Sequence, residues 1–434
     1  MNLRAEIVAL DKRHVWHPYT PMDRYIAEVD PLVIESAAGP RLFDVDGRSY
    51  LDANSSWWVA SLGHAHPRLV AALTKQAARL AHVSLAGVTH EGAARLSEEL
   101  VAVAPPGLTK VFYSDDGSTS VEVAIKLALQ YWQNRGQTKR KRFIALDGAF
   151  HGETIGATSL GGVEVFRRPF AGVLLECVHV PPPSADATES YARAFAALEQ
   201  VITEGRGEIA AVVLEPILQG AGGMRSYDPE YLRRARALCT EHEVLLVVDE
   251  VFTGYGRTGP MWASDLAGIS PDLLCLAKGF SGGMFPMAAT LATQTIFDAF
   301  LGDPTRAFYY GHSYCGNPLG AAVAREVLAI YRDEDILVNA QIKAKRLSAA
   351  FHALAEIPGV TRPRSIGMTG AVDLATGDYL GRVGWRVYEE ARKRGAYLRP
   401  LGDIVYVAPP LNIPDVDLDE LLTIVRESVV AALA

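Results

Sequence analysis

The sequence predicts an α/β fold built on a mostly parallel sheet that helices cover on both faces. Between residues 111 and 279, short β-rich runs alternate with longer segments whose apolar residues recur at helical spacing. The β-rich runs are continuously apolar, without polar residues at every second position, which is typical of strands buried on both faces of a parallel sheet. The chain has 434 residues, a length that indicates two to three domains.

The predicted elements begin with two short strands in the first 60 residues, at 33–39 and 41–47, which are too few to form a domain. The strand at 111–118 leads through a turn into a helix whose apolar residues recur at helical spacing, namely Val121, Ile125, Leu129 and Trp132. The alternation continues with strands at 142–148, 176–181, 209–216, 244–250 and 273–279, and with helices around 191–202 and from 229 to 242.

The sequence changes character near Pro318. One long Ala-rich helix is predicted over 319–354, and it is followed by short strands near 367–374 and 405–409 and by a closing amphipathic helix. This part indicates a smaller α+β unit, which the early strands complete. We therefore expect a large α/β domain over residues 61–323 and a small domain built from residues 1–60 and 324–434.

Charge and composition exclude several classes of protein. With 50 acidic and 42 basic residues, the formal net charge is −8, which argues against binding to nucleic acid or to anionic lipid. No apolar run approaches the ~20 residues of a membrane span, and the N-terminal residues lack the apolar core of a signal peptide. The four cysteines lie 36 or more residues apart, so we expect reduced thiols in a cytoplasmic protein.

Two ionisable residues end successive apolar strands. Asp249 follows VLLVV and Lys278 follows LLCLA, and open α/β sheets bind ligands at the carboxyl ends of their strands. An unpartnered carboxylate in such apolar surroundings is costly, so Asp249 should meet a cation or a hydrogen-bond donor. Either residue alone is equally consistent with a strand-end charge in a loop. Together they favour pyridoxal phosphate, which needs a lysine amine for a Schiff base and a carboxylate to keep its pyridine nitrogen protonated.

A phosphate group also needs a cradle of free N–H groups. The segment DGSTS at 116–120 offers one, because it lies between a predicted strand and a predicted helix. By itself this segment is more typical of an ordinary helix cap. Asp115 and Asp116 would repel a phosphate, so we expect them to face solvent or to cap the helix.

Other motifs are less specific. Residues 254–259 match G-x-G-x-x-G, but they begin after the end of the strand, and the candidate acid Asp272 opens the next strand when it should close it. His64 and His66 have no carboxylate or thiol at ligand spacing, so no metal site is predicted. The pair Trp57 and Trp58 is consistent either with core anchors or with the wall of a ligand pocket.

Several motifs together resemble the fold-type I, class III pyridoxal-phosphate aminotransferases. They are GSTSVEVAIKLALQYW, GAFHGET, EPILQGAGGM, VVDEVFTGYGRTG, LAKGFSGG and YGHSYCGNPLGAA. Three further segments, WHPYT, NSSWWVASLGHAHP and LRPLGDIVYVAPP, are similar to the members that aminate 8-amino-7-oxononanoate to 7,8-diaminononanoate in biotin synthesis. The resemblance runs from about residue 11 to about residue 430.

The resemblance implies a role for each residue of a site shared between two subunits. Lys278 is expected to form the Schiff base, and Asp249 is expected to pair with the pyridinium nitrogen. The other residues implied for the cofactor are Gly117 and Ser118 at the phosphate, Phe150 stacked on the ring, and His312 and Ser313 reaching the phosphate bound by the neighbouring subunit of a homodimer. The substrate pocket is expected to be lined by Tyr19, Trp57, Trp58, Phe150, Gly311 and Arg399, with Arg399 holding a terminal carboxylate.

The sequence departs from the family pattern at three places. Phe150 replaces the usual tyrosine, so one hydroxyl contact is missing, and Glu153 stands where Asp is common. GHSY at 311–314 replaces the HGPT common in members that use S-adenosylmethionine, and it resembles a branch with lysine-using members. We expect S-adenosylmethionine as the amino donor, with lysine as the alternative. Three other interpretations are another class III ω-amino-acid aminotransferase or aminomutase, a non-catalytic protein of the same fold, and a nucleotide-dependent dehydrogenase.

Overall fold

The computed structural model describes residues 3–184, 188–375 and 377–434. Its largest sheet has seven strands in the order β4-β12-β11-β10-β7-β5-β6. All neighbouring strands in it are parallel except the two pairs that β12 makes with β11 and with β4. The predicted α/β fold with a mostly parallel sheet is therefore confirmed. The strands are β4 (Leu108–Ser114), β5 (Arg142–Leu146), β6 (Cys177–Val180), β7 (Ile209–Leu214), β10 (Leu245–Asp249), β11 (Leu273–Leu276) and β12 (Ala288–Thr293).

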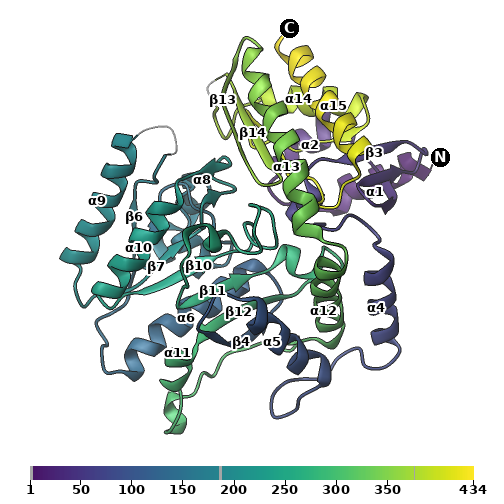
Figure 1. Cartoon of the computed structure of the whole chain (residues 1–434). Coiled ribbons are helices and arrows are strands. Elements are labelled where there is room, and N and C mark those ends of the chain that lie inside the picture. The colour runs from purple at the N-terminus through teal and green to yellow at the C-terminus, as the bar shows by residue number, and fades with distance from the viewer. Residues whose placement is uncertain (1–2, 185–187, 376) are drawn as a thin grey trace.

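Helices surround this sheet in the lower part of Figure 1. They are α4 (Pro67–Ala77), α5 (Glu91–Val103), α6 (Gly117–Asn134), α7 (Ile155–Leu160), α8 (Glu164–Arg167), α9 (Thr188–Glu204), α10 (Pro229–Glu241), α11 (Gln294–Asp298) and α12 (Pro318–Asp333). A short hairpin, β8 (Leu218–Gln219) with β9 (Arg225–Ser226), follows β7.

Both faces of the large sheet are buried, which explains its continuously apolar strands. Successive side chains of a strand point to opposite faces. In β10, Leu246 and Val248 belong to the core cluster that includes α10, whereas Leu245 and Val247 belong to the cluster that includes α6. Because neither face meets water, the central strands β7, β10 and β11 carry no charged side chain before their carboxyl ends, where ligands bind in such sheets.

Both ends of the chain meet in a second, smaller unit at the top of Figure 1. In one of its sheets, the early strand β3 runs parallel to the late strand β15, and Leu51 lies opposite Ala396. This sheet contains β1 (Ile34–Ala38), β2 (Arg41–Asp44), β3 (Ser49–Asp52) and β15 (Ala396–Tyr397), and the other contains β13 (Val360–Ile366), β14 (Thr369–Leu374) and β16 (Ile404–Val407). The helices of the unit are α1 (Leu3–His14), α2 (Met22–Glu28), α13 (Ile336–Ala353), α14 (Val383–Lys393) and α15 (Asp415–Leu433). The boundaries predicted at residues 60 and 323 stay a prediction.

The single helix predicted over 319–354 is wrong. The chain forms two helices, α12 and α13, and Asp335 between them has a left-handed backbone with φ of +49°. Aspartate tolerates this conformation better than most residues, so it can end one helix and start the next. The strand β13 escaped prediction because its sequence, VTRPRSI, is polar and contains a proline, both of which are unusual in strands.

Helices long and apolar enough to span a bilayer are absent from the described residues. All four cysteines are free thiols, with Cys239 and Cys275 buried. The cytoplasmic location stays a prediction.

The central strand β10 provides a test of the core. Leu246 is fully buried, so Leu246→Ala leaves a cavity and should destabilise the protein by about 2–5 kcal/mol. Val416 on α15 is 73% exposed, and Val416→Ala should change stability by less than about 0.5 kcal/mol. Thermal unfolding of the two variants measures the difference. Equal midpoints would contradict the buried position of β10.

Candidate active site

The polar ends of five strands converge on one cavity of about 550 Å³. Residues that follow β4, β5, β7 and β11, together with the last residue of β10, line its wall. Eight of the predicted site residues are among the lining residues, namely Tyr19, Trp57, Trp58, Gly117, Ser118, Phe150, Asp249 and Lys278. Side chains that lie far apart in the sequence therefore share one chamber at the carboxyl edge of the sheet.

Lys278 begins a short 3₁₀ turn directly after β11, with a left-handed backbone φ of +49°. Its Nζ atom lies 4.6 Å from the ring centroid of Trp58 and 5.7 Å from that of Phe252. Burial lowers the pKa of Lys278 to about 8, although the charges of Asp249 and Glu215 oppose this shift. The amine is therefore partly neutral near neutral pH, which is the state that a nucleophile or a general base requires.

Asp249 meets two hydrogen-bond donors, as its apolar surroundings require. The Nδ1 atom of His151 lies 2.8 Å from one carboxylate oxygen, and the main-chain N–H of Val251 donates to the other at 3.0 Å. Burial opposes the charged form of His151, but the hydrogen bond and charge of Asp249 outweigh it, and the pKa of the imidazole is raised. No role was assigned to His151 from the sequence, because no local pattern placed it beside Asp249.

The N-terminus of α6 forms the opposite end of the cavity. Asp116 caps this helix, because its side chain accepts the N–H of Thr119 at 2.9 Å while the hydroxyl of Thr119 accepts the N–H of Asp116 at 3.1 Å. Gly117 is tightly enclosed, since a Cβ there would lie 2.7 Å from a methyl carbon of Val251. The hydroxyl of Ser118 accepts the N–H of Glu153 at 3.0 Å. Gly117 and Ser118 thus bring the N-terminus of α6 to the cavity wall.

Glu215 is a site residue that the sequence analysis missed. It follows β7, lines the cavity, and accepts the N–H groups of Phe150 and Gly220, each at 2.9 Å. Burial raises the pKa of its carboxyl to about 7. Its position after an apolar strand, which resembles that of Asp249, is the signal that could have identified it.

Aromatic side chains form the outer wall of the cavity. The hydroxyl of Tyr19 donates to Glu153 at 2.6 Å, and the ring of Tyr19 lies edge-on to Trp57 with centroids 5.1 Å apart. Two further lining residues, Phe166 and Tyr379, stack edge-to-face at 5.6 Å. Neither Phe166 nor Tyr379 carried a sequence signal, because Phe166 lies in the four-residue helix α8 and Tyr379 in a turn, and both segments are too short for a periodic pattern.

Arg399 lies just behind this aromatic wall and is not itself a lining residue. Its guanidinium carbon is 4.7 Å from the ring centroid of Trp57, and its Nη2 atom donates to the main-chain oxygen of Tyr19 at 3.3 Å. The arginine predicted to hold a carboxylate is thus in contact with two of the predicted substrate-binding residues.

The Trp57–Trp58 pair lies in a turn of unusual conformation. The segment α3, Ser55–Trp58, has left-handed φ values of +47°, +45°, +68° and +73° at four successive non-glycine residues. Trp58 packs against Phe252 with centroids 4.2 Å apart, and its indole N–H donates to the hydroxyl of Tyr406 at 3.0 Å. Trp58 therefore packs in the core and also lines the cavity, while Trp57 contacts Tyr19 and Arg399.

Gly311, His312 and Ser313 do not line the cavity of this chain. The Nδ1 atom of His312 lies 3.5 Å from Asp115, a lining residue. Two aromatic neighbours of the segment, Tyr309 and Tyr314, are 82% and 58% exposed. The segment thus has an accessible surface beside the cavity.

The less specific motifs have structural positions of their own. His64 pairs with Asp52 at 2.8 Å, and the described ranges contain no group of three or more histidine, cysteine or acidic residues suited to a metal ion. The glycines at 254, 256 and 259 lie in a looped segment after β10 that ends in buried Trp262, and not at a strand-to-helix junction.

Known proteins share this architecture over nearly the whole chain. The model of the class-III aminotransferase family matches residues 25–429. The adenosylmethionine-8-amino-7-oxononanoate aminotransferase of Synechococcus elongatus is 44% identical over 422 residues, which cover 95% of this chain and 98% of that protein. The protein of the same name from Geobacter sulfurreducens is 39% identical, and the match covers 96% of this chain and 96% of that protein.

Solved structures agree with these relatives. The crystal structure of adenosylmethionine-8-amino-7-oxononanoate aminotransferase from Methanocaldococcus jannaschii superposes with a TM-score of 0.93 at 35% identity, and the match covers 98% of this chain and 99% of that one. The omega transaminase of Pseudomonas jessenii in complex with PMP has a TM-score of 0.91 at 28% identity, and the match covers 100% of this chain and 98% of that one. The chain therefore belongs to the class III aminotransferases.

Proposed function

We propose that this protein is a pyridoxal-phosphate-dependent aminotransferase that converts 8-amino-7-oxononanoate to 7,8-diaminononanoate in biotin synthesis. The observation that carries the proposal is the meeting of Lys278 and Asp249 in one cavity. Asp249 lies opposite Cys275 in the pairing of β10 with β11, so Lys278 follows only three residues further along the adjacent strand. The substrate is supported by the names of relatives that match this chain over nearly its whole length.

The residues of the cavity fit pyridoxal phosphate. Lys278 supplies a partly neutral amine, and Asp249 supplies a carboxylate that is oriented by His151 and Val251. Gly117 and Ser118, at the N-terminus of α6, supply N–H groups and a hydroxyl for the phosphate, with Phe150 as the ring that covers the cofactor. When bound, this cofactor supplies an electron sink that stabilises negative charge at the carbon bearing the amino group.

The proton transfers of the reaction are assigned to Lys278. An amine with a pKa of about 8 can take a proton from the α-carbon of the donor and return it at a neighbouring carbon as an ammonium. His151 orients the carboxylate of Asp249, and Glu215 holds the main chain of Phe150 in place. Two substrates that use the same amine in turn imply ping-pong kinetics.

The acceptor substrate has an apolar chain that ends in a carboxylate, and the outer cavity suits both parts. The rings of Tyr19, Trp57, Phe166 and Tyr379 supply apolar contact. The guanidinium of Arg399, in contact with Trp57 and Tyr19, is assigned to the carboxylate, which a planar fork of N–H groups matches. Phe150 in place of tyrosine removes one hydroxyl from this pocket.

S-adenosylmethionine is proposed as the amino donor because the relatives at 39–44% identity carry it in their names. The alternative donor is lysine, which the GHSY segment at 311–314 favours. A second candidate function is that of an ω-amino-acid aminotransferase, which the likeness to the omega transaminase favours.

A homodimer with shared active sites is part of the proposal. The segment with Gly311, His312 and Ser313 lies beside the cavity without lining it, and the aromatic rings of Tyr309 and Tyr314 are exposed. These residues are assigned to the cofactor phosphate and substrate pocket of the neighbouring subunit. Exposed aromatic side chains are enriched where subunits meet.

The first prediction separates the two donors. Purified protein mixed with 8-amino-7-oxononanoate and S-adenosylmethionine should form 7,8-diaminononanoate, as followed by mass spectrometry of the products, whereas lysine alone should not support the reaction. Lys278→Ala should abolish product formation with either donor. Product formation with lysine alone would identify lysine as the donor. Transfer of the amino group of an ω-amino acid to a keto acid, without activity on the oxononanoate, would favour the second candidate function.

The second prediction concerns the amine itself. In cofactor-free protein, acetylation of Lys278 should rise with pH around a midpoint near 8, because only the neutral amine reacts and burial lowers its pKa from 10.5. Peptide mass spectrometry, normalised to acetylation of the exposed Lys139 in the same reaction, measures the profile. A midpoint above pH 10 would contradict a desolvated amine.

The third prediction tests the shared site by complementation. Lys278→Ala and the double variant His312→Ala, Ser313→Ala should each be impaired, because each lacks one half of every active site. A heterodimer of the two, isolated with different affinity tags, should recover about half of the wild-type activity, since one of its two sites has all of these residues. A heterodimer no more active than its parents would place His312 and Ser313 in the cavity of their own chain.

A further inference from the structure

The segment Ser55–Trp58 holds a backbone conformation that its sequence does not favour. Left-handed φ values at successive non-glycine residues bring each Cβ close to the following carbonyl oxygen, so such a turn persists only where the surrounding structure enforces it. Its main-chain hydrogen bonds are intact, because the N–H of Trp58 reaches the oxygen of Asn54 at 2.7 Å and that of Val59 reaches Ser55 at 2.9 Å. The enforcing contacts must therefore come from side chains and from other parts of the chain.

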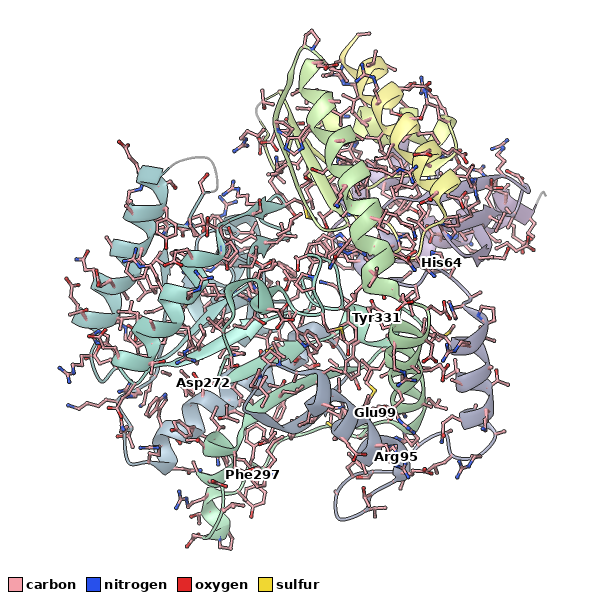
Figure 2. All side chains as sticks on the ribbon, in the orientation of Figure 1. His64, Arg95, Glu99, Asp272, Phe297 and Tyr331 are labelled. Carbon is pink, nitrogen blue, oxygen red and sulfur yellow. The ribbon has the colours of Figure 1, made fainter. Side chains whose placement is uncertain are left out.

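Most of these contacts join the turn to the late part of the chain. The hydroxyl of Ser55 donates to the oxygen of Ala408 at 2.8 Å, and the indole of Trp58 donates to the hydroxyl of Tyr406 at 3.0 Å. On the other side, Ser56 donates to Asp52 at 2.9 Å, and Asp52 in turn pairs with His64. Figure 2 shows His64 where the upper unit meets the helices below it.

Asn54 directly precedes the turn and is 1% exposed. Its amide nitrogen donates to the main-chain oxygen of Tyr406 at 3.3 Å, and its amide oxygen accepts the main-chain N–H of Arg399 at 2.6 Å. Its own main-chain N–H donates to Asp52 at 3.2 Å. Asn54 is thus bonded at once to the start of the strained turn, to β16 and to the main chain of Arg399.

Asn54 joins the two parts of the chain that carry Trp57, at the cavity wall, and Arg399, beside that wall. On one side is Trp57, which packs against Tyr19; on the other is Arg399, whose guanidinium lies over the ring of Trp57. The separation between the aromatic wall and the cationic group depends on this junction, because Trp57 and Arg399 are far apart in the sequence.

We propose that Asn54 is a positioning residue that fixes the distance between the aromatic wall at Trp57 and the guanidinium of Arg399, and so sets the preference of the pocket for an apolar chain with a terminal carboxylate. This inference rests on the proposed function for the identity of the substrate. Asn54 itself does not line the cavity. It acts through Trp57, which lines the cavity, and through Arg399, which lies beside it.

The test compares two acceptors, 8-amino-7-oxononanoate and the analogue that lacks the terminal carboxylate. Asn54→Ala should lower kcat/KM for the oxononanoate by about tenfold or more, mainly through KM, because the carboxylate no longer meets Arg399 at the right distance. The value for the analogue should stay within about twofold, so the ratio of the two values falls. Asn54→Asp, which keeps the acceptor for Arg399 but loses the donor to Tyr406, should lower the ratio by less.

A matched control is Asn412→Ala. Asn412 also joins the late chain to an early segment, since its amide donates to the oxygen of Leu62 at 3.0 Å, but it does not touch Arg399 or the turn. Its loss should leave the ratio unchanged even if it lowers stability. If Asn54→Ala does not fold, Asn54→Asp carries the comparison, and a ratio as high as that of the Asn412→Ala control overturns the inference.

A binding measurement separates this inference from the proposed function. Nonanoate should bind to cofactor-free wild-type protein, about tenfold more weakly to Asn54→Ala, and with a smaller loss to Asn54→Asp, as measured by calorimetry. Near-ultraviolet circular dichroism should report the altered tryptophan environment. If the wild-type protein fails to aminate the oxononanoate, the proposed function fails while the nonanoate comparison still decides the role of Asn54. Equal nonanoate affinity in wild-type protein and in the Asn54 variants overturns it.

Discussion

The parallel pairing of β10 with β11 sets the geometry on which the whole site depends. Hydrogen bonds between these strands place Asp249 opposite Cys275, and the next residues of β11 carry the chain to Lys278 at the same edge of the sheet. The main-chain ladder thus holds Asp249 directly, while Lys278 lies in a short 3₁₀ turn just beyond the end of β11. Burial of both sheet faces fixes the register of this ladder, because a shift would disrupt close packing on both faces.

The same burial determines the charge state of the site. An ionised group in an apolar enclosure is costly unless it is paired or hydrogen-bonded, so the pKa of each buried ionisable residue depends on its partners. Asp249 is hydrogen-bonded to His151, Lys278 has its pKa lowered to about 8, and Glu215 has its pKa raised to about 7. Burial thus favours the neutral form of both Lys278 and Glu215.

The outer half of the pocket has a different origin from the inner half. The inner half is built from the central sheet, whereas Tyr19, Trp57 and Tyr379 come from the two ends of the chain. Those ends are held together by the pairing of β3 with β15 and by the hydrogen bonds of Asn54 and Ser55. Phe166 of α8 completes the outer wall from the large unit, so the wall depends on how the two ends of the chain pack against that unit.

Much of the fold and part of the site followed from local sequence alone. Continuous apolar runs identified the parallel sheet, and charges directly after those runs identified Asp249 and Lys278, because burial on both faces leaves strand ends as the only places for polar groups. The break at Asp335 and the polar strand β13 escaped prediction, since both go against local propensity. Glu215 was missed although it follows the apolar strand β7. His151 and Asn54 could not be assigned, because a hydrogen bond between residues tens or hundreds of positions apart leaves no periodicity in the sequence. The sequence by itself determined which residues end the buried strands, while only the tertiary structure decided which distant side chains meet them, since those contacts depend on how the two ends of the chain pack over the sheet.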